Sequence, residues 1–159
     1  MTTDLSGPSR RKHITLVATA AAVFAVDLAT KITASAALAD RDIDLPGPLD
    51  LRLSHNPGVA FGMGNDTPTW LVLTLTGAVA AGIAVAAWRG LFASSIAAGV
   101  VVGGALANVA DRSQAGTVVD MLYTGWWPTF NVADVAIVCG AFALAATAWR
   151  APPEPATVP

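Results

Sequence analysis

Residues 67–88 read TPTWLVLTLTGAVAAGIAVAAW, and no residue in this stretch is charged. Its length matches the ~20 residues that an α-helix needs to cross the hydrocarbon core of a bilayer. After Arg89, residues 90–110 form a second run without charge, GLFASSIAAGVVVGGALANVA. Only 13% of the 159 residues are charged, against about 25% in an ordinary soluble domain. The sequence therefore predicts a membrane protein.

Two further apolar stretches flank these runs. Residues 14–38 are apolar apart from a few polar side chains that include Asp27 and Lys31, and residues 130–149 are apolar apart from Asp134 near their start. We therefore expect an all-α membrane protein with four transmembrane helices, at about 14–38, 67–88, 90–110 and 130–149. The four-helix membrane domain then covers residues 14–150, residues 1–13 form an N-terminal segment, and the proline-rich tail 151–159 is expected to be disordered.

The first apolar stretch has an alternative interpretation as a cleavable signal peptide. Arg10-Arg11-Lys12 precedes it and Ala34-Ser35-Ala36 resembles a cleavage site. Asp27 and Lys31 interrupt the apolar core, which favours a retained helix over a signal peptide.

The basic residues next to the predicted spans indicate how the chain is oriented. In the four-span model all five lie on one side: Arg10, Arg11, Lys12, Arg89 and Arg150. By the positive-inside rule this side is the cytoplasm. We therefore expect a multi-pass protein of the cytoplasmic (inner) membrane with both termini in the cytoplasm.

The tetrapeptide Asn-Val-Ala-Asp occurs twice, at residues 108–111 and 131–134. Carboxylates near hydrocarbon are costly, so each is a functional hypothesis by default. The third span runs outward and the fourth runs inward, which places Asp111 and Asp134 at the same outer depth. Paired carboxylates there can perform acid and base chemistry on one water molecule. Asp27 and Lys31 also fall in the outer half, on one helix face.

Each of these residues also has a structural interpretation. Asn131 is a candidate cap for the fourth helix, with Asp134 favoured by the helix dipole. Asp111 and Arg112 are candidates for residues that extend from a helix end toward water. Asp27 with Lys31 fits a structural ion pair better than catalysis. A hydrolytic Lys31 and Ser35 pair, also four residues apart, is a weaker alternative.

The two outer loops carry different patterns. In residues 39–66, apolar and polar residues alternate over 43–45 and 49–53 with Pro46-Gly47-Pro48 between them, which predicts a small sheet lying on the membrane. The apolar, glycine-rich residues 59–64 are a candidate interfacial lid. In the second outer loop, 111–129, residues 118–123 and Trp126-Trp127 are expected to rest at the headgroups.

Several chemistries find no support in the sequence. Cys139 is the only cysteine, which excludes an internal disulfide and a thiolate metal cluster. His13 and His55 lie on opposite sides of the membrane in the predicted topology, so they do not share a metal. We find no phosphate-binding glycine loop and no basic patch, and the formal net charge is -2. We therefore expect no cofactor and no nucleic-acid partner.

Five motifs follow one another at the ends of the predicted spans. They are Asp27-x-x-x-Lys31, Asn56-x-Gly58-x-Ala60-Phe61-Gly62, Gly103-Gly104-x-x-x-Asn108-x-x-Asp111-Arg112, Val118-Val119-Asp120 and Phe130-Asn131-x-Ala133-Asp134. Together these motifs resemble the bacterial lipoprotein signal peptidase family, signal peptidase II, over residues 27–134. Leu28, where the family commonly has glutamine, and Ala107, where it usually has glycine, depart from the pattern without touching the acidic pair.

The resemblance implies a membrane aspartyl endopeptidase that cleaves the signal peptide from diacylglyceryl-modified prolipoproteins immediately before the lipidated cysteine. Asp111 and Asp134 match the family's catalytic pair, and no metal is needed. The resemblance also implies a small extracytoplasmic sheet, an interfacial helix around Phe61, and prolipoproteins and membrane lipids as partners. The residues that match supporting positions of the site are Asn56, Asn108, Arg112, Asn131, Asp27, Lys31 and Asp120.

Two other classes of function compete with this reading. A small proton-coupled transporter or channel also uses intramembrane acids, but it predicts acids near the midplane and broken helices. A non-enzymatic assembly subunit would tolerate Asp to Asn changes at both acids.

Overall fold

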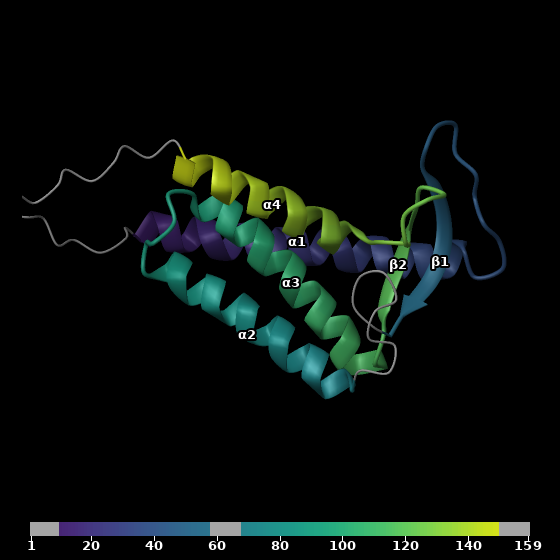
Figure 1. Cartoon of the computed structure of the whole chain (residues 1–159), viewed down its shortest axis with the longest axis horizontal. Coiled ribbons are helices and arrows are strands. Elements are labelled where there is room, and N and C mark those ends of the chain that lie inside the picture. Colours follow the sequence, from purple (N-terminus) through teal and green to yellow (C-terminus); the bar gives the residue numbers. More distant parts are fainter. Residues whose placement is uncertain (1–9, 58–67, 150–159) are drawn as a thin grey trace, which may run out of the picture.

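The computed structural model describes residues 10–57 and 68–149. Within them, helices α1 (Arg10–Ala37), α2 (Thr69–Trp88), α3 (Ser95–Ala115) and α4 (Val132–Trp149) form a bundle. Strands β1 (Asp50–Asn56) and β2 (Val118–Tyr123) form an antiparallel sheet at one end of it (Figure 1). By length and composition, α1, α2 and α4 can each cross a membrane. The predicted lid and the interfacial helix around Phe61 lie outside the described residues.

Helix α3 is the centre of the bundle and packs against the other three helices. Its glycines make this close approach possible. A Cβ atom on Gly103 would lie 2.5 Å from the backbone oxygen of Ala20 in α1, and one on Gly104 would lie 2.6 Å from the backbone oxygen of Ala133 in α4. Small residues at helix interfaces let membrane helices pack backbone to backbone. The close packing of α3 therefore depends on its small residues.

The third helix differs in its bounds from the predicted span 90–110. Gly90 adopts a positive φ of 77° after α2 ends, and α3 begins only after Ser94, whose hydroxyl caps the helix by accepting a hydrogen bond from Ala97 N at 3.1 Å. The helix ends at Gly116, which takes the left-handed conformation common at helix C-termini. The shift follows from these two caps, which hydropathy alone does not detect, and it brings Asp111 and Arg112 inside the helix.

The sheet also differs from the hairpin predicted within residues 43–53. The strand pattern was correct for β1, but its partner is β2 from the second outer loop, paired from Asp50 with Tyr123 to Asn56 with Val118. Ile43 contributes only an isolated bridge to Leu51. Residues 118–123, expected to rest at the headgroups, are therefore a strand. Alternation of apolar and polar residues predicts a half-buried strand, but it does not identify the strand with which it pairs.

Strand β2 presents different residues on its two faces, as the pleat requires. Met121, with Val119, packs onto a cluster that includes Ala34 and Leu38 at the outer end of α1. Asp120 points the other way and is buried, with 1% of its surface exposed. The apolar contact with α1 thus fixes the strand so that this carboxylate faces the bundle.

Candidate functional site

Helix α1 contributes an ion pair to the outer end of the bundle. Asp27 and Lys31 lie one turn apart and are 1% and 3% exposed, and Lys31 Nζ lies 2.7 Å from Asp27 Oδ2. The predicted structural ion pair is confirmed. The other carboxylate oxygen, Asp27 Oδ1, accepts a hydrogen bond of 2.7 Å from the backbone nitrogen of Ala133 in α4.

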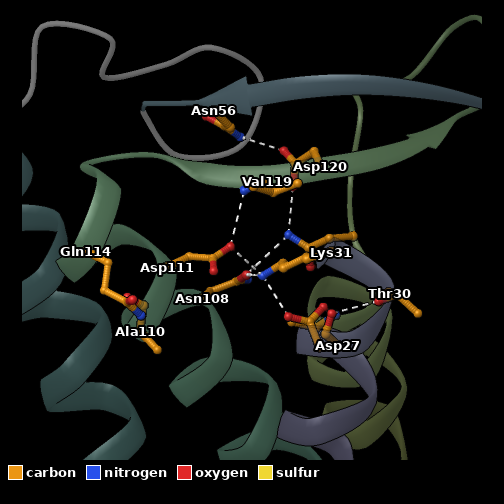
Figure 2. Close-up of polar contacts among 12 residues, drawn as sticks. Asp27, Thr30, Lys31, Asn56, Asn108, Ala110, Asp111, Gln114, Val119 and Asp120 are labelled. Atoms are coloured by element: carbon orange, nitrogen blue, oxygen red, sulfur yellow. Dashed lines mark hydrogen bonds and ion pairs between the residues drawn. The ribbon is translucent and has the colours of Figure 1, made fainter. Parts of the chain in front are cut away.

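The ammonium group of Lys31 also reaches helix α3. It donates to Asn108 Oδ1 at 2.9 Å and lies 3.0 Å from Asp111 Oδ2 (Figure 2). An ammonium group has three N–H donors, and here three acceptors surround it. Lys31 therefore links Asp27 in α1 with Asn108 and Asp111 in α3.

Asn131 and Asp134 cap the start of α4 reciprocally. Asp134 N donates to Asn131 Oδ1 at 2.9 Å, and Asn131 N donates to Asp134 Oδ2 at 3.2 Å. This is the geometry of a capping box, so the capping interpretation of Asn131 is confirmed. Asp134 Oδ1 is not used by the cap and accepts a hydrogen bond of 2.8 Å from Asn108 Nδ2.

The side-chain amide of Asn131 extends the network to the sheet. Asn131 is fully buried, and its Nδ2 donates to Asp120 Oδ1 at 2.7 Å and to Asn108 Oδ1 at 3.2 Å. The other oxygen of Asp120 accepts a hydrogen bond of 3.2 Å from Asn56 Nδ2 in β1 (Figure 2). Asn131 therefore contacts both Asp120 and Asp134.

Charge and burial together raise the pKa of Asp120. Burial raises the pKa of Asp120, the charge of Asp134 raises it further, and hydrogen bonds from Asn131 and Asn56 oppose both effects, leaving a pKa of about 6. The guanidinium of Arg112 is also buried and interacts electrostatically with Asp120, Asp134 and Asp111. An acid with a raised pKa beside a second carboxylate is typical of acid–base sites.

A cavity of about 350 Å³ opens at this network. Its polar lining comes from five of the predicted site residues: Asn56, Asn108, Arg112, Asp120 and Asp134. Its apolar wall includes Val118, Trp127, Phe130, Ile137 and Val138. Asp27, Lys31, Asp111 and Asn131 are not part of its lining.

An apolar groove of about 330 Å³ adjoins the cavity and shares Trp127, Phe130, Asp134 and Val138 with it. Trp126, Val135 and Cys139 complete much of its lining. Trp126 and Trp127 were expected at the membrane interface, but nothing in the sequence indicated that they border the acids. Thr76 of α2, which also lines the cavity, carried no sequence signal.

The structure thus brings all nine predicted site residues to one end of the bundle. Eight of them are joined by a continuous chain of hydrogen bonds and ion pairs, and Arg112 interacts electrostatically with three of the acids. Among residues 10–57 and 68–149, no group of three or more His, Cys, Asp or Glu side chains is placed to hold a metal ion.

Comparison with known proteins places this architecture in a family. The sequence model for signal peptidase (SPase) II matches residues 19–150. The lipoprotein signal peptidase of Rhodococcus jostii (strain RHA1) is 40% identical over 146 residues, covering 86% of this chain and 73% of that protein. The lipoprotein signal peptidase of Mycobacterium avium (strain 104) is 36% identical over 149 residues, covering 86% of this chain and 79% of that protein.

A solved bacterial membrane enzyme, determined by the in meso method, has a similar fold. It superposes with a TM-score of 0.71 at 24% identity over 90% of this chain and 94% of its own. The likeness supports the fold, and the long apolar helices α1, α2 and α4 define a membrane protein. The chain belongs to the signal peptidase II family. The resemblance inferred from the five motifs is confirmed, and the transporter alternative is not favoured.

Proposed function

We propose that this protein is a membrane aspartyl endopeptidase that removes signal peptides from lipid-modified prolipoproteins, cutting immediately before the modified cysteine. Membership of the signal peptidase II family supports the substrate class. The acids that we propose as catalytic are Asp111 and Asp134. The observation that carries the mechanism is the link between them: Asn108 Nδ2 donates to Asp134 Oδ1 at 2.8 Å, and Asn108 Oδ1 accepts from Lys31, whose Nζ lies 3.0 Å from Asp111 Oδ2.

The acid–base chemistry follows from this coupling. Two carboxylates close together do not both ionise cheaply, so they share one proton and titrate as a pair. The ionised partner takes a proton from water, which attacks the scissile carbonyl. The protonated partner hydrogen-bonds the carbonyl oxygen and later protonates the leaving amine. Asn108 and Lys31 hold Asp134 and Asp111 in this arrangement.

Asp120 offers a second candidate partner for Asp134. Asp120 and Asp134 both line the cavity, and the charge of Asp134 raises the pKa of Asp120. Asp111 is outside the cavity lining, and its carboxylate lies beside Lys31, beside the backbone of Val119 and within electrostatic reach of Arg112. The two pairs share Asp134 and differ in the acid that completes it.

The membrane arrangement that we propose has four spans, with α3 as the third. The N-terminal end of α1, which begins with Arg10, Arg11 and Lys12, and the C-terminal end of α2, which Arg89 follows, lie opposite the sheet (Figure 1), which suits a cytoplasmic end. The site then lies at the extracytoplasmic surface of the inner membrane. Helix α3 is not among the helices that qualify as spans by length and composition, and its outer end supplies Asn108, Asp111 and Arg112 to the site.

The juxtaposition of a polar cavity and an apolar groove suits a cut beside a lipid-modified residue. Water reaches the acids through the polar side, and an acyl chain lies in the groove between Trp127, Val135 and Val138. This arrangement at one bundle end also argues against transport, which requires acids near the midplane.

The test is cleavage by purified protein of a diacylglyceryl prolipoprotein, with the same precursor lacking the lipid as control. We expect cleavage of the lipidated precursor only. Asp111→Asn and Asp134→Asn should each lower kcat by at least about 100-fold, the usual minimum for a lost general acid or base. Absence of cleavage by the folded wild type would refute the function. Full activity of Asp111→Asn with loss in Asp120→Asn would transfer the role to Asp120.

A further inference from the structure

A second apolar groove, of about 290 Å³, lies between α1 and α4. We call it the α1–α4 groove, and we call the groove beside Trp127 the tryptophan groove. Both helices are long and apolar enough to cross a membrane, so a groove between them is suited to hydrocarbon. Its lining includes Ala22, Val23 and Val26 of α1 and Val135, Ala136 and Cys139 of α4.

The α1–α4 groove results from the way in which the two helices are held. Both α1 and α4 pack mainly against α3 and only weakly against each other. Gly103 and Gly104 of α3 let the backbones of α1 and α4 approach it closely. Because the two helices are fixed through α3 rather than through each other, a furrow remains between them, and Val26 is 54% exposed there.

Two residues of α4 belong to both grooves. Val135 and Cys139 line the tryptophan groove and the α1–α4 groove alike. They are four residues apart, so they lie on one face of the helix, and both are exposed. Together they form a ridge with one apolar groove on each side, which we call the α4 ridge.

Both grooves begin at the level of the acids. Val135 directly follows Asp134, and Cys139 lies about one turn farther along α4. On α1, Val26 directly precedes Asp27, which a hydrogen bond to the start of α4 places at the same level. Helix α4 runs from there away from the sheet (Figure 1). In the proposed topology both grooves therefore extend from the site toward the middle of the membrane.

We propose that the diacylglyceryl group of the substrate straddles the α4 ridge, with one acyl chain in the tryptophan groove and the other in the α1–α4 groove. This inference rests on the proposed function, which brings the modified cysteine beside Asp134. The two chains leave neighbouring carbons of one glycerol, so they can pass on either side of a single row of side chains. The α1–α4 groove thus makes the enzyme distinguish two-chain from one-chain substrates.

The first experiment fills the α1–α4 groove by Ala22→Phe. Ala22 lines this groove and is not part of the tryptophan groove. The matched control is Ala21→Phe, because Ala21 is an exposed alanine of the same helix that belongs to neither lining. Val26→Trp is a second filling variant, and thermal unfolding establishes that each protein is folded. The purified variants are given precursors with either two acyl chains or one on the glyceryl group.

We expect Ala22→Phe and Val26→Trp to raise KM for the two-chain precursor about three- to ten-fold. The effect is modest because lipid tails are as apolar as the groove, so the second chain loses van der Waals contacts rather than a hydrophobic environment. KM for the one-chain precursor should not change, because a single chain lies in the tryptophan groove. The value of kcat should not change either, and Ala21→Phe should match the wild type with both precursors.

A binding measurement without cleavage uses Cys139, the only cysteine in the sequence. Its thiol is exposed on the α4 ridge, so the rate of its alkylation by N-ethylmaleimide reports whether the ridge is covered. The ligands are S-diacylglyceryl cysteine methyl ester, its one-chain analogue and phosphatidylglycerol, and none of them contains a scissile peptide bond. We expect the two-chain cysteine to slow alkylation of the wild type most, and to protect Ala22→Phe no better than the one-chain analogue does.

Equal increases in KM for both precursors would overturn the inference, because the filled groove then obstructs the signal peptide rather than a second chain. KM values that match Ala21→Phe, with unchanged protection of Cys139, would overturn it as well. Equal protection by phosphatidylglycerol would show that bulk lipid covers the ridge, which also contradicts the inference. Alkylation does not depend on cleavage, so a wild type that is protected by the two-chain cysteine but does not cut the precursor refutes the proposed function alone.

Discussion

Asp27 in α1 and Ala133 in α4 are joined by a hydrogen bond of 2.7 Å from the backbone nitrogen of Ala133 to Asp27 Oδ1. The first N–H groups of a helix have no partner within it, and a negative charge there is favoured by the helix dipole. Asp27 therefore caps α4 from a neighbouring helix while it pairs with Lys31. The same carboxylate anchors the bundle and the polar network of the site.

This double role predicts a large stability effect at Asp27. Asp27→Leu leaves the N–H of Ala133 without its acceptor and removes one of the two carboxylates beside Lys31, so we expect a loss of roughly 3–5 kcal/mol in the free energy of unfolding. Asp27→Asn keeps an acceptor oxygen and should lose less. Thermal unfolding of both variants in detergent measures the difference. Equal melting temperatures for the two variants would show that the bond to Ala133 contributes nothing.

Asp120 should make stability depend on pH. Its pKa is raised from an ordinary value of 3.8 to about 6 in the folded protein, so the folded state binds more protons between these values. The contribution of Asp120 to stability is therefore full below pH 4 and is lost as pH rises through about 6. Unfolding measured from pH 4 to pH 7 should show the wild type losing stability relative to Asp120→Asn. A constant difference across that range would contradict the raised pKa.

The apolar groove predicts a selective effect on lipidated substrates. Val138→Trp should fill the groove beside Asp134 and raise KM for a lipidated precursor several-fold, because the acyl chain loses its space. Phe142→Trp is the control, since Phe142 is an exposed residue of the same helix outside the groove lining. Steady-state cleavage of a short-chain and a long-chain lipidated precursor measures the effect. Similar KM values for both variants would remove the groove from substrate binding.

Helix packing predicts opposite outcomes at two glycines. A Cβ on Gly104 would lie 2.6 Å from the backbone oxygen of Ala133, whereas one on Gly77 in α2 would meet nothing within 4 Å. We expect Gly104→Ala to cost about 1–3 kcal/mol through overpacking, and Gly77→Ala to be neutral or stabilising because alanine favours helix. Thermal unfolding of the two variants checks this. A stable Gly104→Ala protein would show that α3 and α4 separate easily.

The proposed topology predicts where attached reporters are found. Fusions after Leu38 or Arg112 should report the extracytoplasmic side, and fusions after Arg89 or Arg150 the cytoplasm, because the basic residues remain inside. Paired alkaline phosphatase and fluorescent protein fusions measure both sides. A cytoplasmic signal from the Leu38 fusion would place the acids on the wrong face and reject the four-span arrangement.

Much of this protein is determined by local sequence patterns. The uncharged run 67–88 predicts α2, and the spacing of Asp27 and Lys31 predicts their pairing within α1, because helix geometry alone places residues i and i+4 together. Asn131 and Asp134 form a cap for the same local reason. Counting spans predicts that Asp111 and Asp134 lie at the same end of the bundle, since successive helices reverse direction, whereas Asp120 was indicated only by the family motif.

The tertiary structure alone decided the partners across elements. β1 pairs with residues 118–123 and not with its own loop, and Lys31 reaches beyond Asp27 to Asp111. The sequence favoured Asp111 as the partner of Asp134, yet the cavity is lined by Asp120. The carboxylate that faces the cavity is determined by the rotation of α3 and the pleat of β2 where these elements meet. Both are set by packing between segments far apart in the chain. No local sequence pattern contains this information.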